Sequence, residues 1–223
     1  MKHIASITTL TLVAAAGFAD AAAPAAAPAS AWSQSANLAF TSDYIWRGIS
    51  QNAGHTAVQG GFDIAHTSGL SAGVWASNVT NTTTAAANLE VDLYANYGFK
   101  VAGIDASVGY IAYSYEGSSA DNFSEVNVGA TVFGINAKVS KNISAGNDYY
   151  YELAYNYNVP AVKDLVLGLH YGFADKATTT EDYSVALTYP VAGFAATVSY
   201  SNTPGNFVTG SDSTTAISLK KTF

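Results

Sequence analysis

The segment that decides the fold runs from Asn88 to Phe99 and reads NLEVDLYANYGF. Its odd-numbered residues, from Leu89 to Phe99, are apolar or aromatic, whereas its even-numbered residues are mostly polar or acidic. Successive side chains of a β-strand point to opposite faces, so this alternation predicts a strand with one apolar and one polar face. About ten such residues in a tilted strand are enough to cross a bilayer.

The same alternation recurs along the rest of the chain. It covers the further segments 36–41, 58–64, 70–74, 104–110, 125–132, 135–139, 149–158, 165–171, 183–189, 194–200 and 217–223. Bacterial membrane barrels have an even number of antiparallel strands. We therefore predict an all-β fold, a transmembrane antiparallel up-and-down β-barrel of about 12 strands. Segments 70–74 and 135–139 alternate least clearly, so a barrel of 10 strands is the alternative.

The connections between these segments alternate in length. Tight connections lie near 67–69, 100–103, 134, 160–164 and 190–193, and longer polar ones near 48–55, 80–87, 116–122, 144–147, 174–180 and 202–213. A membrane barrel with short periplasmic turns, long outer loops and both termini in the periplasm has this alternation. A soluble β-sandwich, the competing interpretation, gives no reason for it.

The composition narrows the function classes. The chain is 49% hydrophobic and only 11% charged, against roughly 25% charged residues in ordinary soluble domains, and its mean hydropathy is +0.14. A net charge of −7 argues against a nucleic-acid partner, which favours a basic surface. The absence of cysteine excludes disulfides and thiolate metal sites, and no cofactor motif appears, so we expect no cofactor.

The N-terminus has the features of an export signal. Lys2 and His3 precede the charge-free apolar run from Ile4 to Ala19, and small residues follow. This pattern predicts a secretory signal peptide over residues 1–21, with cleavage as late as 31. A transmembrane helix is the weaker interpretation, because the run is short for a span. Residues 22–34 form a low-complexity leader, and the barrel is expected over 35–223.

Two stretches resemble a known family. The segment 41–51, TSDYIWRGISQ, followed by QGGFD at 59–63, resembles the TorF family of outer-membrane porins, and the closing KKTF at 220–223 resembles that family's ending. The resemblance implies a β-barrel in the outer membrane of a Gram-negative bacterium with a pore role. It does not supply the transported solute.

The C-terminus also resembles the assembly signal of outer-membrane proteins. Phe223 is terminal, and Leu219 and Ile217 supply apolar residues at alternate positions before it, whereas Lys221 departs from that pattern. Lys221 can extend its ammonium group to the periplasmic interface. The expected partners are outer-membrane lipid, the barrel-assembly machinery, periplasmic chaperones and small polar solutes.

Extending the alternation of the first strand predicts where its last residues point. Asp43 and Arg47 would face inward, while Tyr44 and Trp46 would face outward in an aromatic girdle. Arg47 could line the mouth of a pore, or it could clamp carboxylates in an internal ion-pair network. We favour the clamp, because Arg47 is the only arginine and its planar fork holds carboxylates in a fixed geometry.

Alternation also predicts an acid-rich outer mouth. The inward acids near the outer strand ends are Glu90, Asp92, Glu125, Glu152 and Asp182, while Lys138 is the inward base of the lower barrel. With Asp43 and Arg47 these are the candidate pore-lining residues, and such a mouth would attract cations. Alternatively, they neutralise one another in a plugged lumen. Small inward residues such as Gly73 and Gly172 leave room, which favours a narrow pore.

Two function hypotheses remain. The first is a narrow channel for passive diffusion of small polar solutes, weakly cation-preferring. The second is a non-conducting barrel with a structural or surface-binding role, which an ordered plug in the lumen would favour. An enzyme is disfavoured, because no nucleophile sits in a recognisable elbow or beside a plausible His–acid pair.

Overall fold

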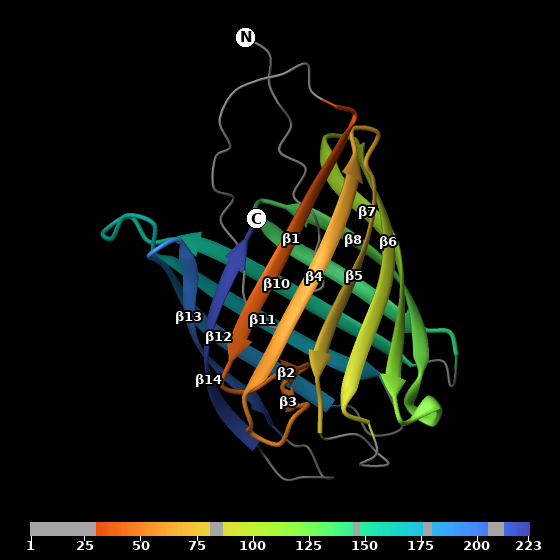
Figure 1. Cartoon of the computed structure of the whole chain (residues 1–223). Helices are drawn as coiled ribbons and strands as arrows, with labels where there is room; N and C mark the ends of the chain where they lie inside the picture. The colour runs from red at the N-terminus through yellow and green to blue at the C-terminus, as the bar shows by residue number, and fades with distance from the viewer. Residues whose placement is uncertain (1–29, 81–86, 145–147, 176–179, 205–211) are drawn as a thin grey trace.

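Twelve strands close into one antiparallel barrel in the computed structural model, which describes residues 30–80, 87–144, 148–175, 180–204 and 212–223 (Figure 1). Strands adjacent in sequence pair in the barrel, and β1 closes it by pairing with both β4 and β14. The barrel strands are β1 (Trp32–Thr41), β4 (Ala57–His66), β5 (Leu70–Asn78), β6 (Leu89–Val101), β7 (Ile104–Glu116), β8 (Phe123–Val132), β9 (Ile135–Asn142), β10 (Tyr149–Asn158), β11 (Val166–Asp175), β12 (Thr180–Val191), β13 (Phe194–Thr203) and β14 (Asp212–Thr222). The prediction of 12 strands is confirmed, and the alternative of 10 is wrong.

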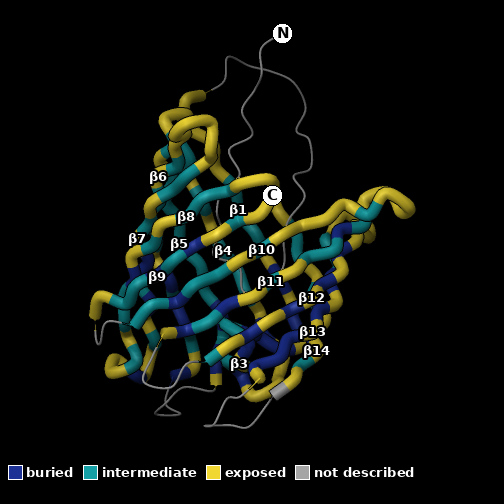
Figure 2. The backbone as a smooth tube through the Cα atoms, turned by 180° about the vertical axis from the view of Figure 1, so that it is seen from behind, coloured by how far each residue is buried: buried dark blue, intermediate teal, exposed yellow. Residues whose placement is uncertain are grey.

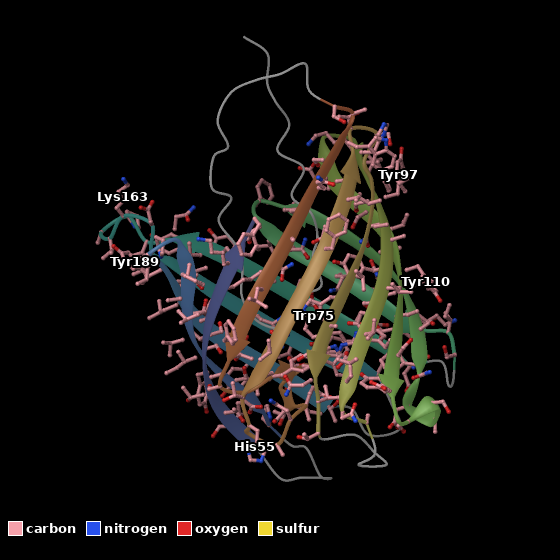
Figure 3. All side chains as sticks on the ribbon, viewed as in Figure 1. His55, Trp75, Tyr97, Tyr110, Lys163 and Tyr189 are labelled. Carbon is pink, nitrogen blue, oxygen red and sulfur yellow. The ribbon has the colours of Figure 1, made fainter. Side chains whose placement is uncertain are left out.

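The two faces of the wall are as the alternation predicts. On β6, the outward Leu93 is 58% exposed, while the inward Asp92 is 4% exposed. Tyr97, Tyr110 and Tyr189 project from the outside of the wall (Figure 3). The barrel therefore has an apolar, aromatic-rich outer surface and a polar interior.

Short turns join the strands at one end of the barrel. The β6–β7, β8–β9 and β12–β13 turns each hold a two-residue pair ending in glycine with both φ angles positive, such as Ala102–Gly103 and Phe133–Gly134. Two positive φ angles define the type I′ turn, whose twist matches that of paired strands. The remaining connections lie at the other end, called the loop end below. The predicted alternation of short and long connections holds only in part, because the β10–β11 connection at the short-turn end, residues 159–165, is longer than the loop-end connections 117–122 and 143–148.

The C-terminus completes the barrel. The backbone N–H of Phe223 donates to the carbonyl of Ala36 at 2.8 Å, one residue beyond the pairing of Asn37 with Thr222. Lys221 extends toward two aromatic rings, with its Nζ atom 5.3 Å from the Phe194 centroid and 6.0 Å from that of Phe223. The terminal phenylalanine is thus part of the seam that removes the sheet edges.

Burial differs between the two ends. The most buried residues gather toward the loop end (Figure 2), where Ile45–Trp46 (β2) and Ile49–Ser50 (β3) form a small separate sheet (Figure 1). A 3-10 turn, Ser119–Asp121, lies between β7 and β8. The predicted signal peptide and residues 22–29 of the leader lie outside the described residues, and β1 begins at Trp32, slightly before the expected 35. No helix among the described residues is long and apolar enough to span a membrane.

Candidate functional site in the barrel lumen

The chain leaves the wall after Thr41 and turns into the lumen. Residues 42–56 carry the β2–β3 hairpin, whose turn is formed by Arg47 (φ 48°) and Gly48 (φ 76°). The prediction that the first strand continues to Arg47 is therefore wrong. Tyr44 is 3% exposed, and both it and Trp46 pack against inward aromatic residues, so their predicted place in an outward girdle is also wrong.

The base of the hairpin is held by an apolar cluster and by hydrogen bonds. Tyr44, Ala57, Val79 and Ala87 are buried together, and the Tyr44 ring lies 5.3 Å from that of Trp75 on β5, edge to face. The Tyr44 N–H donates to Asn52 Oδ1 at 2.8 Å. Asn52 is fully buried, so its side chain fixes the return of the hairpin toward the wall.

The tip of the hairpin is held by its arginine. Arg47 Nη1 and Nη2 donate to the two carboxylate oxygens of Glu125 on β8, each at 2.8 Å. The guanidinium carbon lies 4.0 Å from the Tyr150 centroid on β10 and 4.3 Å from that of Trp46. β8 and β10 lie across the barrel from β1 and β4, so the hairpin spans the lumen.

Gly48 is required at this tip. A Cβ atom there would overlap the Thr203 side chain and come within 2.7 Å of the Asp182 Cβ. Gly48 also has a positive φ, which L side chains rarely adopt. Arg47 and Gly48 therefore form the turn of the hairpin, and the lack of a side chain at Gly48 lets the turn lie close to β12 and β13.

Two further clusters of charged side chains lie on the wall from β9 to β12, next to the contact between Arg47 and Glu125. Lys138 Nζ lies 3.0 Å from Glu152 Oε1, linking β9 to β10. The Tyr150 hydroxyl donates to Asp182 Oδ2 at 2.8 Å, while His170 Nε2 lies 2.9 Å from Asp182 Oδ1. Each of these inward acids thus has a basic or hydroxyl partner.

The acids of β6 are in a different situation. Glu90 and Asp92 are 1% and 4% exposed. The Tyr44 hydroxyl donates to Glu90 Oε1 at 3.3 Å, but Glu90 Oε2 and Asp92 Oδ1 have no hydrogen-bond partner. Among the described residues, neither acid forms an ion pair, so no cationic side chain neutralises them.

Inward glycines leave less free space than expected. A Cβ on Gly73 would lie 2.6 Å from Tyr94 Cζ and 2.7 Å from Asp63 Oδ1, because Tyr94 reaches over the glycine to donate to Asp63 at 2.5 Å. Tyr150 crosses Gly172 in the same way to reach Asp182. The expectation that these glycines open the lumen is wrong, because side chains from adjacent strands fill their positions.

A cavity remains beside the hairpin at the loop end. It encloses about 330 Å³ and is lined by residues including Trp46, Arg47, Phe123, Tyr150 and Asp182. One of its sides is formed by the hairpin and the other by the wall from β7 to β13. A small solute entering from this end would therefore contact aromatic rings, the arginine and several carboxylates.

The electrostatics of the loop residues reflect their burial. Burial raises the pKa of Asp43, although the Ser50 hydroxyl donates to its Oδ1 atom at 2.7 Å. Burial also raises the pKa of Tyr44, and nearby Glu90 adds to this effect. Burial alone would lower the pKa of Arg47, but the Glu125 carboxylate outweighs it, so the guanidinium stays charged.

The structure brings most of the predicted residues together at the loop end. Glu90, Asp92, Glu125, Lys138, Glu152 and Asp182 all face inward, and Asp43 and Arg47 reach the lumen from the loop instead of from a strand. Their pore-lining role stays a prediction, while the interpretation of Arg47 as a clamp agrees with its contacts. The described residues hold no group of three or more His, Asp or Glu side chains that could bind a metal ion.

The sequence analysis missed Tyr44, Trp46 and Tyr150 as lumen residues. A signal for the first two was present, because Arg47–Gly48 has the residue-plus-glycine pattern of the short turns 102–103 and 133–134. Tyr150 has inward parity on β10, and Gly172 on β11 leaves the space that its ring crosses.

The fold is similar to that of solved porins. The KdgM porin superposes with a TM-score of 0.59 over 85% of this chain and 98% of its own, at 10% sequence identity. The KdgM porin in complex with disordered oligogalacturonate gives a TM-score of 0.58 over 86% and 98% of the two chains, at 9% identity. Identities this low show a likeness of fold alone.

None of the curated proteins matches the sequence. One family model does, and it covers residues 25–223, which include the entire barrel. The chain belongs to that family, Gcw_chp, a family of bacterial proteins of unknown function.

Proposed function

We propose that the protein is a narrow outer-membrane pore through which small polar solutes diffuse passively, with a weak preference for cations. The observation that carries the proposal is a closed barrel with an apolar outer surface and a polar lumen. Lipid chains can solvate the apolar outer face. Because the barrel is closed, its backbone hydrogen bonds leave no unpaired sheet edge in the hydrocarbon. The resemblance of 41–51 to the TorF family and the likeness of fold to KdgM support the same function.

The pore would be narrow for two reasons. Barrels of about eight strands are filled by their own side chains, whereas those of sixteen or more leave a water channel, and this barrel has 12 strands. In addition, the hairpin of residues 42–56 crosses the mouth. The passage left for a solute is the side occupied by the 330 Å³ cavity.

Single-channel recording in a planar bilayer tests the proposal. We expect small conductance steps from the purified protein. A variant with residues 44–52 replaced by a short Gly–Ser linker should give steps at least several-fold larger, because the tip and base contacts are lost. Heat-unfolded protein serves as the control. If neither protein conducts in several salts, the pore function is wrong.

The hairpin also gives a reason to keep the second function, a non-conducting barrel with a structural or surface-binding role. An ordered segment already fills part of the mouth, and its base and tip are both fixed. Conductance from the linker variant but not from the wild type would indicate a barrel that stays closed unless the hairpin moves.

The proposed location is the outer membrane of a Gram-negative bacterium, reached with the help of periplasmic chaperones and the barrel-assembly machinery. The signal-like pattern of residues 2–21 and the apolar residues at alternate positions, Ile217, Leu219 and Phe223, support this route. N-terminal sequencing of protein extracted from outer membranes should begin between about Ala22 and Trp32. Recovery of chains that still start at Met1 would contradict export by a cleaved signal.

A further inference from the structure

The wall opposite the hairpin base holds a site that fits a guanidinium group. Glu125 presents both carboxylate oxygens at 2.8 Å to Arg47, and the Tyr150 ring covers one face of the guanidinium carbon at 4.0 Å. The Tyr113 hydroxyl donates to Glu125 Oε2 at 3.5 Å. A carboxylate fork with an aromatic platform is the arrangement that recognises planar guanidinium, which a compact ammonium cannot match.

Glu125 and Tyr150, which form this site, belong to the barrel wall, whereas Arg47, whose side chain occupies it, belongs to the hairpin. Glu125 and Tyr150 sit on β8 and β10, in rigid strands, and each is buried at 3% exposure. Arg47 reaches them only because residues 42–56 fold inward. Without the Arg47 side chain, Glu125 would keep its place but lose its cation, and an unpaired buried carboxylate is costly.

The site also adjoins the cavity beside the hairpin. Arg47, Glu125 and Tyr150 all line that 330 Å³ space, so a solute entering from the loop end meets the site directly. Asp182 on the same wall adds a further carboxylate. A guanidinium-bearing solute could therefore form the contacts that Arg47 forms.

We propose that Glu125 and Tyr150 form a lumenal binding site for solutes that carry a guanidinium group, and that Arg47 occupies it as an internal competitor. This inference deepens the proposed pore function, on which it rests for its solute, by naming a solute class. Binding of such a solute displaces the Arg47 side chain and weakens the attachment of the hairpin tip. The contact of Arg47 with Glu125 and Tyr150 narrows the mouth, and a solute with a guanidinium group widens the mouth by replacing Arg47 in that contact.

Chemical rescue tests the site without requiring conduction. The Arg47→Ala variant, purified as the full chain in lipid vesicles, should unfold at a lower Tm than the wild type. Millimolar ethylguanidinium should restore most of that loss, because a ligand that binds the folded state stabilises it. Ethylammonium at the same concentration should restore much less. If Arg47→Ala does not refold, Arg47→Gln is measured in its place.

Two double variants identify the residue that binds. Ethylguanidinium should not rescue Arg47→Ala combined with Glu125→Gln, but it should still rescue Arg47→Ala combined with Glu90→Gln, which removes a buried inward acid on β6, two strands away from β8. No rescue, equal rescue by ethylammonium, or rescue that persists without Glu125 would overturn the proposal. Rescue in a protein that never conducts would support the site and refute the pore, so the two failures are distinguishable.

Discussion

The two ends of the lumen are made by the same alternating strands, yet among the described residues a hairpin narrows only one of them. At the loop end, Tyr113, Glu90 and Asp92 are at most 4% exposed, whereas at the other end the inward Asn156 and Asn158 are exposed. Strand alternation alone does not account for this difference, because both ends have polar and small inward residues. The hairpin of residues 42–56 accounts for the lower exposure at the loop end, so this one loop determines how wide that end of the lumen is.

The ion pairs of the two ends give the largest expected contrast. Arg47–Glu125 is enclosed at the loop end, with side-chain exposures of 17% and 4%, while Lys100–Asp105 at the short turns has 61% and 66%. Arg47→Ala should cost about 3–5 kcal/mol of unfolding free energy, because it leaves a buried carboxylate unpaired. Lys100→Ala should cost less than about 1 kcal/mol.

Urea unfolding of both variants in the same lipid measures this contrast. Equal costs would mean that the hairpin tip is as solvated as the short-turn surface, and the distinction between the two ends would fail.

The next contrast compares the two faces of one strand. Leu93 on β6 points outward and Asn96 inward. Leu93→Arg should cost about 2–4 kcal/mol if the residue lies near the bilayer midplane. Asn96→Arg should cost much less, because its charge enters the polar lumen. The same unfolding assay applies, and the reverse order of costs would reject the assignment of faces.

The sequence predicts the local features of this molecule better than it predicts the contacts between distant segments. The alternation from Leu89 to Phe99 predicts both faces of β6, because strand parity is a local property. The path of residues 42–56 depends instead on contacts between distant segments, such as Arg47 with Glu125 and Tyr44 with Trp75. Parity carried past Thr41 therefore assigned Tyr44 and Trp46 to the wrong side of the wall.

The site was predictable in its residue types but not in its pairing. Inward parity identified the five predicted acids on the strands, yet it could not say that Glu125 meets Arg47 while Asp92 keeps an unpaired oxygen. Pairing requires the distances across the lumen, and these follow from strand number and from the hairpin. The filled glycine positions were missed for the same reason, since Tyr94 reaches Asp63 from another strand.

A glycine substitution offers a smaller contrast along one strand. Gly172 on β11 is crossed by Tyr150 near the loop end, whereas a Cβ on Gly168, closer to the short turns, would meet its nearest atom, Asn156 Oδ1, at 3.3 Å. Gly172→Ala should destabilise by about 1–3 kcal/mol, because it pushes Tyr150 off Asp182. Gly168→Ala should change stability less. Thermal unfolding of the two variants compares them, and equal shifts in Tm would indicate that Tyr150 moves aside at little cost.

The smallest expected effect concerns the charge of the mouth. Arg47 neutralises Glu125, and Lys138 neutralises Glu152, whereas Glu90 and Asp92 form no ion pair among the described residues, so these two acids are the ones to test for the proposed cation preference. Changing Glu90→Gln and Asp92→Asn together keeps the shape and removes their charge. Under a KCl gradient, the reversal potential of the pore should then move toward zero, because low-dielectric walls no longer focus a negative field into the opening.

Screening sets the size of this effect and supplies its control. The Debye length is about 10 Å at 0.1 M salt and about 3 Å at 1 M, so the preference should be modest in dilute KCl and fade in concentrated KCl. Glu125→Gln provides the opposite change, because it frees the Arg47 charge in the mouth and should shift the reversal potential toward anions. If the Glu90 and Asp92 variants leave the potential unchanged while Glu125→Gln shifts it, the buried β6 acids are protonated at the mouth. Selectivity would then be set at the tip of the hairpin, by the balance between Arg47 and its carboxylate.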